Sequence, residues 1–352
     1  MQSRQPCLAA IATAVPPHAL GQEEVTRRAR LIYAERGTID LERMMPVFAN
    51  STIERRYSCV PIEWYENPRG WTERNALYLE HAQSLLERAA RDCLDRAGMT
   101  PRDIDAVVTV STTGIATPSL DALLSNRMGF RPDVKRLPIF GLGCAGGVLG
   151  LARAADWARA MPGARVLYLV VELCALSFRR NDTSKSNIVA TALFGDGAAA
   201  AVLTGDGRGG GAVFGPGGEH LFPDTLGIMG WDVGEDGLKA VFSRDIPALV
   251  KREMRDASSA FLARSRLALK DVDRFVCHPG GTKVLGALED AFGIAENTLT
   301  VEREVLRDYG NMSAATLLFV LERVMRQRPH GRMMLTAMGP GFTAGFQLLE
   351  AA

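Results

Sequence analysis

A cysteine in a glycine-rich turn between a strand and a helix is the feature that most restricts what this chain can fold into. The turn reads Gly-Leu-Gly-Cys-Ala-Gly-Gly over residues 141–147, with apolar residues 137–140 before it and small apolar residues 148–155 after it. We expect a short buried strand, a turn that carries Cys144, and then a helix. A thiol at a helix N-terminus feels the positive end of the helix dipole, which favours thiolate. A buried cysteine that only packs is the alternative interpretation.

Length, charge and cysteine usage narrow the class of protein. A chain of 352 residues predicts two domains or two fused halves, and a net charge of +1 without a long basic block argues against nucleic acid as a partner. The six cysteines are scattered without a Cys-x-x-Cys pair, which argues against disulfides and zinc and favours a cytoplasmic protein. Residues 8–15 are interpreted as a first strand and not as a signal peptide. No apolar run approaches the ~20 residues that span a bilayer, so no integral membrane segment is expected.

The rest of the chain alternates between strand-like and helix-like apolar runs. Residues 71–97 carry apolar side chains at helical spacing and are followed by Gly98, so they predict one long helix. Strands are expected at residues 104–111, 165–171, 198–203, 274–277 and 332–338, and helices at residues 249–262, 283–292 and 314–325. This alternation predicts an α/β architecture with buried sheets. The glycine cluster at residues 205–218 is interpreted as a connection between an N-terminal half, residues 1–204, and a C-terminal half, residues 205–352.

Two further polar residues stand where helices are expected to begin. His278 follows the apolar residues 275–277 and precedes Pro-Gly-Gly, and Asn311 lies between Tyr-Gly and the helix expected at 314–325. Each has a structural alternative, since an asparagine often only caps its helix. Together with Cys144, however, they place polar groups at the starts of three separate helices, which indicates a functional site.

These segments resemble the type III polyketide synthases, the chalcone- and stilbene-synthase-like branch of the thiolase superfamily. Nearly the whole chain takes part, with motifs in the family's order: Gly-Cys-Ala-Gly at 143–146, Leu-Phe-Gly-Asp-Gly-Ala-Ala at 193–199, His-Pro-Gly-Gly at 278–281, Tyr-Gly-Asn-Met-Ser at 309–313 and Gly-Pro-Gly at 339–341. A ketoacyl-carrier-protein synthase would carry Gln and Asn soon after the histidine, where this chain has Pro-Gly-Gly. The resemblance implies a five-layered αβαβα thiolase-like fold from two similar halves, a homodimer, and a cis bond before Pro118.

The resemblance also implies a mechanism. Cys144, as a thiolate paired with His278, would attack an acyl-CoA thioester and hold the starter covalently. Malonyl-CoA would then bind with its thioester oxygen between His278 and Asn311, which would stabilise the enolate formed by loss of CO2. The carbanion would attack the acyl group on Cys144 in a Claisen condensation. Acyl-CoA and malonyl-CoA are the implied substrates, and no metal or organic cofactor is implied.

Further residues are implied at the substrate site. Phe194 matches the phenylalanine between CoA tunnel and cavity, with a core aromatic as the alternative, whereas Ala240 or a neighbour stands at the position of the second such phenylalanine of plant enzymes. Alignment with the family motifs assigns further residues to the substrate site. They are Thr113, Cys174, Ser177 and Ala190 in the cavity, Trp231 at its edge, and the Gly339-Pro340-Gly341 motif. Cys174 as simple core packing is an equally good interpretation of that residue taken alone.

Basic residues near the entrance are expected to contact the CoA phosphates, because arginine binds them bidentately. Arg43, Arg55 and Arg56 are the candidates, and Arg56 matches the family best. Asn50 stands where plant relatives carry a lysine. A solvated basic face is the alternative.

The identity of the starter depends on the cavity. Residues 171–178 look more like bacterial alkylresorcinol and alkylpyrone synthases than plant chalcone synthases, and such enzymes are primed by long fatty acyl groups. Small side chains at Cys174 and Ala190 are compatible with an apolar tunnel. We therefore expect a fatty-acyl-primed synthase. The alternatives are a malonyl- or short-acyl-primed synthase, a carrier-protein-dependent ketoacyl synthase, and a non-catalytic thiolase-fold subunit.

Overall fold

The computed structural model describes residues 5–34, 41–207 and 211–352. The strands are β1 (Cys7–Ala14), β2 (His18–Gly21), β3 (Arg55–Ser58), β4 (Ala106–Val110), β5 (Lys135–Ile139), β6 (Arg165–Leu173), β7 (Asp196–Thr204), β8 (Val213–Leu221), β9 (Met229–Gly234), β10 (Gly237–Phe242), β11 (Arg274–Cys277), β12 (Gly331–Gly339) and β13 (Thr343–Ala351). The α-helices are α1 (Gln22–Ala34), α2 (Leu41–Met44), α3 (Pro46–Asn50), α4 (Trp71–Ala97), α5 (Leu120–Met128), α6 (Gly146–Ala160), α7 (Lys185–Leu193), α8 (Ile246–Ala263), α9 (Thr282–Phe292), α10 (Thr300–Tyr309) and α11 (Ala314–Arg326).

Two groups of strands with similar arrangements make up the main sheet, whose order is β11-β12-β13-β8-β1-β7-β6-β4-β5. In one group β5, β4 and β6 run parallel and β7 and β1 pair antiparallel; in the other β11 and β12 run parallel and β13 and β8 pair antiparallel. The groups meet through one residue pair, Cys7 with Val213. Residues before 205 supply the first group and residues after 212 supply the second.

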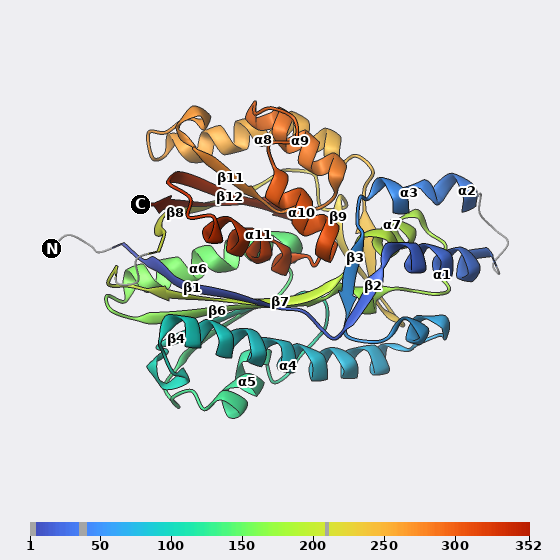
Figure 1. Ribbon diagram of the computed structural model, residues 1–352, viewed down its shortest axis with the longest axis horizontal. Coiled ribbons are helices and arrows are strands. Elements are labelled where there is room, and N and C mark those ends of the chain that lie inside the picture. Colours follow the sequence, from blue (N-terminus) through green and yellow to red (C-terminus); the bar gives the residue numbers. More distant parts are fainter. Residues whose placement is uncertain (1–4, 35–40, 208–210) are drawn as a thin grey trace.

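Helices separate and cover the two groups of strands. Figure 1 shows α4 and α5 below one group, α8 and α9 above the other, and α6 and α11 in the layer between them. The predicted five-layered αβαβα arrangement is therefore confirmed. Both central helices begin beside a candidate catalytic residue, because α6 follows Cys144 and α11 follows Asn311.

Local patterns account for most of the elements. The helix predicted at residues 71–97 is α4, and Gly98 ends it in the left-handed conformation with φ 63°. The bond between Thr117 and Pro118 is cis, as expected. No helix among the described residues is long and apolar enough to cross a membrane.

Two expectations about the strands are wrong. The strand before the Cys144 turn is not buried: β5 is an edge strand, and Phe140 just after it is 58% exposed. The glycines expected in a connection up to residue 218 lie partly in β8, while residues 208–210 lie outside the described part of the chain. A Cβ on Gly217 would lie 2.9 Å from that of Ala152 on α6, and a Cβ on Gly218 would lie 2.6 Å from the Phe261 ring on α8. These glycines let the helices on both sides approach the strand closely.

Candidate active site

Cys144 lies on a one-turn 3-10 helix, η3 (Gly143–Ala145), that leads directly into α6. Gly143 has φ 47°, and a Cβ there would lie 2.6 Å from the Pro340 ring. A Cβ on Gly147 would lie 2.4 Å from the carbonyl oxygen of Ala314 on α11. The glycines around the cysteine are therefore required both by the turn and by the close packing of α6 against α11.

His278 follows β11 and precedes the turn into α9. Its backbone N–H donates to the Thr336 carbonyl at 2.9 Å, so β12 fixes its position. The side chain is 3% exposed, and neither ring nitrogen has a hydrogen-bond partner among the described residues. Buried polar groups are normally paired, so this ring is available to a substrate.

Asn311 is held in one orientation by backbone and side-chain contacts. Its N–H donates to the Leu193 carbonyl at 2.8 Å, and its carbonyl accepts from Gly195 N–H at 3.0 Å. Its Nδ2 donates to the Gly280 carbonyl at 3.2 Å, beside His278, and its Oδ1 accepts from the Ser313 N–H at 2.8 Å. The amide is thus oriented, not simply a helix cap.

The side chains of Cys144, His278 and Asn311 line one cavity of about 450 Å³. They come from three separate strand-to-helix or helix-to-helix junctions, so the fold brings together residues that are far apart in sequence. A volume of this size is typical of a small-molecule site. Within the described residues, no group of three or more His, Cys, Asp or Glu side chains is placed to hold a metal ion.

Burial sets the protonation of this site. It raises the pKa of Cys144 to about 12, with the nearby Glu172 carboxylate acting in the same direction and the Ser313 hydroxyl against it. Burial also lowers the pKa of His278 to about 3. Both shifts favour a neutral thiol and a neutral imidazole in this structure, because desolvation opposes the effect of the helix dipole. The thiolate expected from the sequence stays a prediction.

A buried polar network behind Cys144 escaped the sequence analysis. Cys144 Sγ lies 3.5 Å from Ser313 Oγ, Gly143 N–H donates to the Thr112 hydroxyl at 3.2 Å, and Thr112 N–H donates to the Glu172 carboxylate at 3.0 Å. Glu172 is fully buried, and burial raises its pKa to about 7. The sequence does contain an indication of this buried carboxyl, because Glu172 interrupts the otherwise apolar strand of residues 165–173.

Comparison with known proteins agrees with this geometry. The model of the N-terminal domain of chalcone and stilbene synthases matches residues 2–207, and that of their C-terminal domain matches residues 216–349. The chain belongs to the chalcone and stilbene synthase family. It is a type III polyketide synthase, an acyltransferase-type condensing enzyme.

Similar proteins cover the chain almost from end to end. The 1,3,6,8-tetrahydroxynaphthalene synthase of Streptomyces peucetius subsp. caesius is 40% identical over 97% of this chain and 92% of its own. The phloroglucinol synthase of Pseudomonas fluorescens is 29% identical over 94% of each chain. Among solved structures, the tetrahydroxynaphthalene synthase of Streptomyces coelicolor A3(2) has TM-score 0.93 at 30% identity, covering 98% and 99%. CsyB complexed with CoA-SH has TM-score 0.88 at 25% identity, covering 99% and 100%.

In this synthase, Phe194 lies at the centre of an apolar cluster. The cluster contains Cys174, Ala190, Phe194 and Ala240, with Trp231 and Phe242 packed against it. The Phe194 ring centroid is 5.6 Å from that of Phe242 and 6.3 Å from that of Trp231. Several residues predicted to meet the substrate are thus brought together.

The cluster separates two cavities. Phe242 lines the catalytic cavity, whereas Cys174, Ser177, Ala190 and Phe194 line a second cavity of about 60 Å³. The ring pair of Phe194 and Phe242 stands between them. Phe194 thus lines the second cavity, while its predicted place between the CoA tunnel and the substrate cavity stays a prediction.

Most of the other residues predicted to contact substrate pack around the Cys144 turn and β6, outside the lining of the two cavities. Thr113 accepts a hydrogen bond from Leu173 N–H at 2.9 Å and lines neither cavity. Gly339 and Pro340 pack against the Cys144 turn, and a Cβ on Gly339 would lie 2.2 Å from the Leu142 carbonyl oxygen. Gly341 has φ 128° and likewise lines neither cavity. Gly339 and Pro340 thus face the nucleophile turn, Thr113 faces β6, and Gly341 lies beside Thr343 and Leu221. Their contact with substrate stays a prediction.

Arg56 cannot contact CoA phosphates in this structure. It is 3% exposed, and its guanidinium donates to the carbonyls of Thr191, Ala192 and Phe194 and to the Gln22 side chain. That prediction is therefore wrong, because both terminal nitrogens of the guanidinium donate to groups inside the protein. Arg55 is exposed beside the Tyr57 ring, outside the cavity lining.

Exposed basic side chains stand elsewhere around the catalytic cavity. They are Arg43, Lys185, Arg244 and Lys283, all on its lining. Arg43 was a candidate from the sequence, and Asn50 also lines the cavity. The other basic residues carry no motif of their own, and only folding brings them together.

Proposed function

We propose that this synthase carries out decarboxylative Claisen condensation of malonyl-CoA with an acyl group bound to Cys144. The observation that supports it most is the shared cavity of Cys144, His278 and Asn311, in which neither ring nitrogen of His278 has a partner within the part of the chain that the structure describes. A neutral imidazole can accept a proton in one step and donate a hydrogen bond in another. That property suits both half-reactions.

Acylation starts from the neutral pair. The Cys144 thiol transfers its proton to His278 as the sulfur attacks the thioester carbonyl, and the imidazolium returns that proton to the departing CoA sulfur. An acyl thioester on Cys144 and free CoA are the products. Proton transfer on attack removes the need for a resting thiolate.

Condensation follows at the same place. The malonyl thioester oxygen accepts hydrogen bonds from His278 and from the Asn311 amide while CO2 leaves, so the enolate charge develops beside preformed donors. The enolate carbon attacks the acyl carbonyl, and the Cys144 thiolate is expelled. No metal ion or organic cofactor is needed to balance these steps.

The exposed cations around the cavity suit the phosphates of CoA. Arg43, Lys185, Arg244 and Lys283 can approach a multiply charged group at the surface while the pantetheine arm enters the cavity. A structural neighbour, CsyB, is a complex with CoA-SH. CoA thioesters are thus the proposed substrates.

The starter is proposed to be a fatty acyl group. The second cavity is lined by small or apolar side chains at Cys174, Ser177 and Ala190, which suits an alkyl tail. This cavity is much smaller than the catalytic cavity, about 60 Å³ against about 450 Å³. A long tail therefore requires Phe194 and Phe242 to move, after which each buried CH2 contributes about 0.8 kcal/mol.

A malonyl- or short-acyl-primed synthase is the second candidate. The products named for similar enzymes, tetrahydroxynaphthalene and phloroglucinol, carry no alkyl chain. Trp231 and Phe242 fill the space beside Phe194, which also favours a short starter. A carrier-protein-dependent ketoacyl synthase receives no such support, and the geometry of Cys144, His278 and Asn311 argues against a non-catalytic subunit.

A homodimer is also proposed. Ile115, two residues before the cis Thr117–Pro118 bond, is 49% exposed, and Phe140, directly after the edge strand β5, is 58% exposed. Exposed apolar side chains at a sheet edge suit contact with a second copy. Sedimentation of the purified chain tests this, and a monomer at micromolar concentration would contradict it.

One experiment separates the two starters. The protein is incubated with labelled malonyl-CoA and a panel from acetyl-CoA to stearoyl-CoA, and products are identified by mass, with Cys144→Ala as the blank. Alkylpyrones or alkylresorcinols from long starters support the first candidate. Aromatic products built only from labelled malonyl-CoA, whichever starter is present, support the second candidate. The absence of any condensation product contradicts both candidates.

A further inference from the structure

The β9–β10 hairpin carries one wall of the substrate site, yet it pairs with no other strand that the structure describes. Ala240 pairs directly with Trp231 across the hairpin, and Phe242 continues the same face toward Phe194. A two-stranded hairpin by itself is at best marginally stable. Its position must therefore depend on contacts from outside the hairpin.

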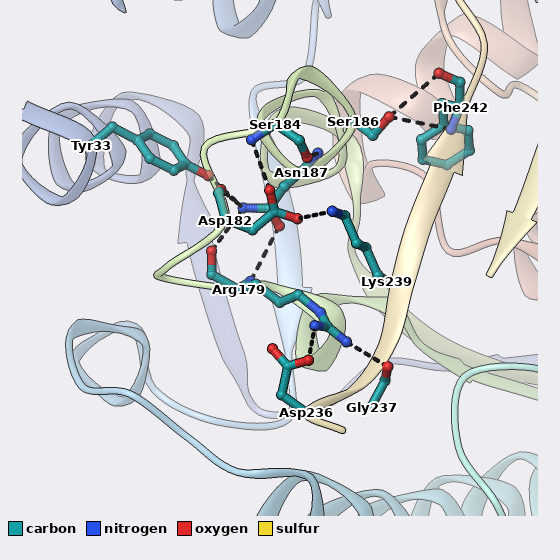
Figure 2. Close-up of polar contacts among 10 residues, drawn as sticks. All are labelled: Tyr33, Arg179, Asp182, Ser184, Ser186, Asn187, Asp236, Gly237, Lys239 and Phe242. Atoms are coloured by element: carbon teal, nitrogen blue, oxygen red, sulfur yellow. Dashed lines mark hydrogen bonds and ion pairs between the residues drawn. The ribbon is translucent and has the colours of Figure 1, made fainter. Parts of the chain in front are cut away.

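Arg179 makes the main contact with the turn of this hairpin. Figure 2 shows its guanidinium between Asp236 and Gly237, where it donates to the Asp236 carboxylate and, at 2.5 Å, to the Gly237 carbonyl. The Arg179 residue is only 8% exposed. A mostly buried arginine fork that contacts a carboxylate and a backbone carbonyl together fixes both position and direction.

The other side of the turn rests on α4. Gly237 has φ 100°, and a Cβ on it would lie 2.2 Å from the Trp71 ring. The start of β10 is therefore contacted by both Trp71 and Arg179. Glycine is required here by both its backbone conformation and the close approach of the ring.

The segment that carries Arg179 contacts the hairpin at two further places. Lys239 Nζ lies 3.4 Å from the Asp182 carboxylate, and the Ser186 hydroxyl lies 3.5 Å from the Phe242 backbone. Figure 2 shows these contacts along the length of β10. Residues 179–186 thus hold β10 from its turn to its end.

Asn187 fixes that segment in turn. Its Nδ2 donates to the carbonyls of Arg179 and Asp182 at 2.8 and 2.6 Å and lies 3.1 Å from the Tyr33 hydroxyl oxygen, and its Oδ1 accepts from the Arg179 N–H at 3.2 Å. The side chain is 4% exposed. A buried amide with this many partners specifies one conformation of the loop.

We infer that Arg179 is a positioning residue for starter specificity: it fastens the β9–β10 turn and so fixes Trp231 and Phe242 against Phe194. It does not line either cavity and acts only through the hairpin. The hairpin's position decides how far the space beside Phe194 opens to an acyl chain. The inference rests on the proposed function in that the acyl group is taken to enter beside Phe194.

Two unrelated changes test it. Arg179→Gln removes the positive charge and the guanidinium fork, and Gly237→Ala pushes the turn off Trp71 while leaving Arg179 intact. Arg127→Gln is the matched control, because it breaks a 2.7 Å ion pair with Glu87 outside the hairpin and cavities. Arg179→Lys keeps the charge but not the fork and is expected to fall between Arg179→Gln and the unchanged protein.

Hydrogen exchange of residues 229–242 and kcat/KM for acyl-CoAs of increasing length are measured on every variant. Both hairpin variants should exchange these residues about tenfold faster, with peptides around Cys144 and His278 unchanged. Their ratio of kcat/KM for long and short starters should shift about tenfold, while malonyl-CoA decarboxylation stays within about threefold. Arg127→Gln should change neither measurement.

The outcomes separate this inference from the proposed starter. Unchanged exchange, or faster exchange with an unchanged starter ratio, overturns the inference. An equal loss for every starter in folded protein shows a general structural role and also overturns it. If the unchanged enzyme rejects long starters but both hairpin variants accept longer ones, the fatty-acyl starter fails and the inference stands. If Arg179→Gln does not fold, Gly237→Ala decides by the same criteria.

Discussion

Ser313 contacts Cys144 and orients Asn311 at the same time. Its Oγ lies 3.5 Å from the Cys144 sulfur, and its backbone N–H donates to Asn311 Oδ1 at 2.8 Å. The backbone of Ser313 has φ 48°, which is uncommon for residues other than glycine. Such backbone conformations persist where the surrounding structure holds them. The nucleophile and the enolate-binding amide are therefore linked through one residue.

Ser313→Ala should make Cys144 less reactive. The Ser313 hydroxyl lowers the pKa of Cys144 against the effect of burial, so its loss should raise that pKa further. A hydrogen bond is worth about 0.5–1.5 kcal/mol, so alkylation of Cys144 by iodoacetamide at fixed pH should slow about three- to tenfold. Mass spectrometry against pH measures the shift. Ser177→Ala is the control, and an unchanged alkylation profile would contradict the role of Ser313.

Asn311→Ala should separate the two half-reactions. Removing one donor to a developing oxyanion costs on the order of 100- to 1,000-fold in rate, so malonyl-CoA decarboxylation should fall by that factor. Acylation of Cys144, which uses His278 as its proton acceptor, should fall much less. Single-turnover acylation and CO2 release are measured on the same preparation. Equal losses in both would show that the two roles are not separate.

The sequence predicted the catalytic junctions well because each depends on local chemistry. A cysteine, a histidine and an asparagine followed by glycine or small residues mark the chain turns at Cys144, His278 and Asn311, and the structure places all three in one cavity. The long helix α4 was equally clear, since its apolar spacing and Gly98 are local signals.

Long-range packing explains what the sequence did not reveal. Arg56 looked like a surface arginine, but β3 carries it into the interior, where backbone carbonyls from the end of α7 accept its hydrogen bonds. The glycines at 217 and 218 looked like a linker, because the helices that approach them come from distant segments. The cations Lys185 and Lys283 meet at the cavity only in the folded chain. None of these relationships has a periodic pattern.

Arg56 and Lys283 should therefore respond differently to mutation. Lys283→Ala removes an exposed cation beside the cavity and should raise KM for malonyl-CoA about three- to tenfold, with a smaller effect at high salt. Arg56→Met leaves several buried acceptors unpaired and should lower the free energy of unfolding by about 3 kcal/mol or more. Steady-state kinetics and urea unfolding measure the two effects. A raised KM in folded Arg56→Met would restore its predicted role at the phosphates.

The stability of the protein should fall as pH rises from about 5 to 8. Burial raises the pKa of Glu172, Asp196 and Glu302 to about 7 in each case. Between the ordinary glutamate or aspartate pKa and about 7, the folded state binds more protons than the unfolded state, so unfolding becomes easier with rising pH. The stabilising contribution of the protonated groups is complete at low pH and is lost as pH passes 7.

Glu302→Gln tests this dependence away from the catalytic cavity. The amide oxygen can still accept the hydrogen bond from Cys277 N–H, which the carboxylate accepts at 3.1 Å, but the side chain no longer titrates. The variant should lose part of the slope, on the order of 1 kcal/mol per pH unit for one group. Urea unfolding at pH 5, 6, 7 and 8 measures it. A slope equal to that of the unchanged protein would show that Glu302 does not hold a proton in the folded state.

Ala190→Phe should decide whether an acyl chain enters the second cavity. Ala190 is 3% exposed and packs with Phe194 and Cys174, so a phenyl ring there fills the space beyond the Phe194 ring. Each CH2 of a starter that can no longer be buried forfeits about 0.8 kcal/mol, so long acyl-CoAs should lose kcat/KM steeply while short ones keep it.

Added volume in a packed interior can itself destabilise a protein by about 1–3 kcal/mol, so thermal unfolding of Ala190→Phe is measured beside its activity. Ala192→Phe is a matched control, since Ala192 is also buried on α7 but belongs to the cluster under α1 and α3. A folded Ala190→Phe enzyme with unchanged length preference would show that the chain does not pass Ala190. If both variants lose kcat/KM equally for all starters, the cause is damage to α7. The loss would then be the same wherever on α7 the new ring is placed.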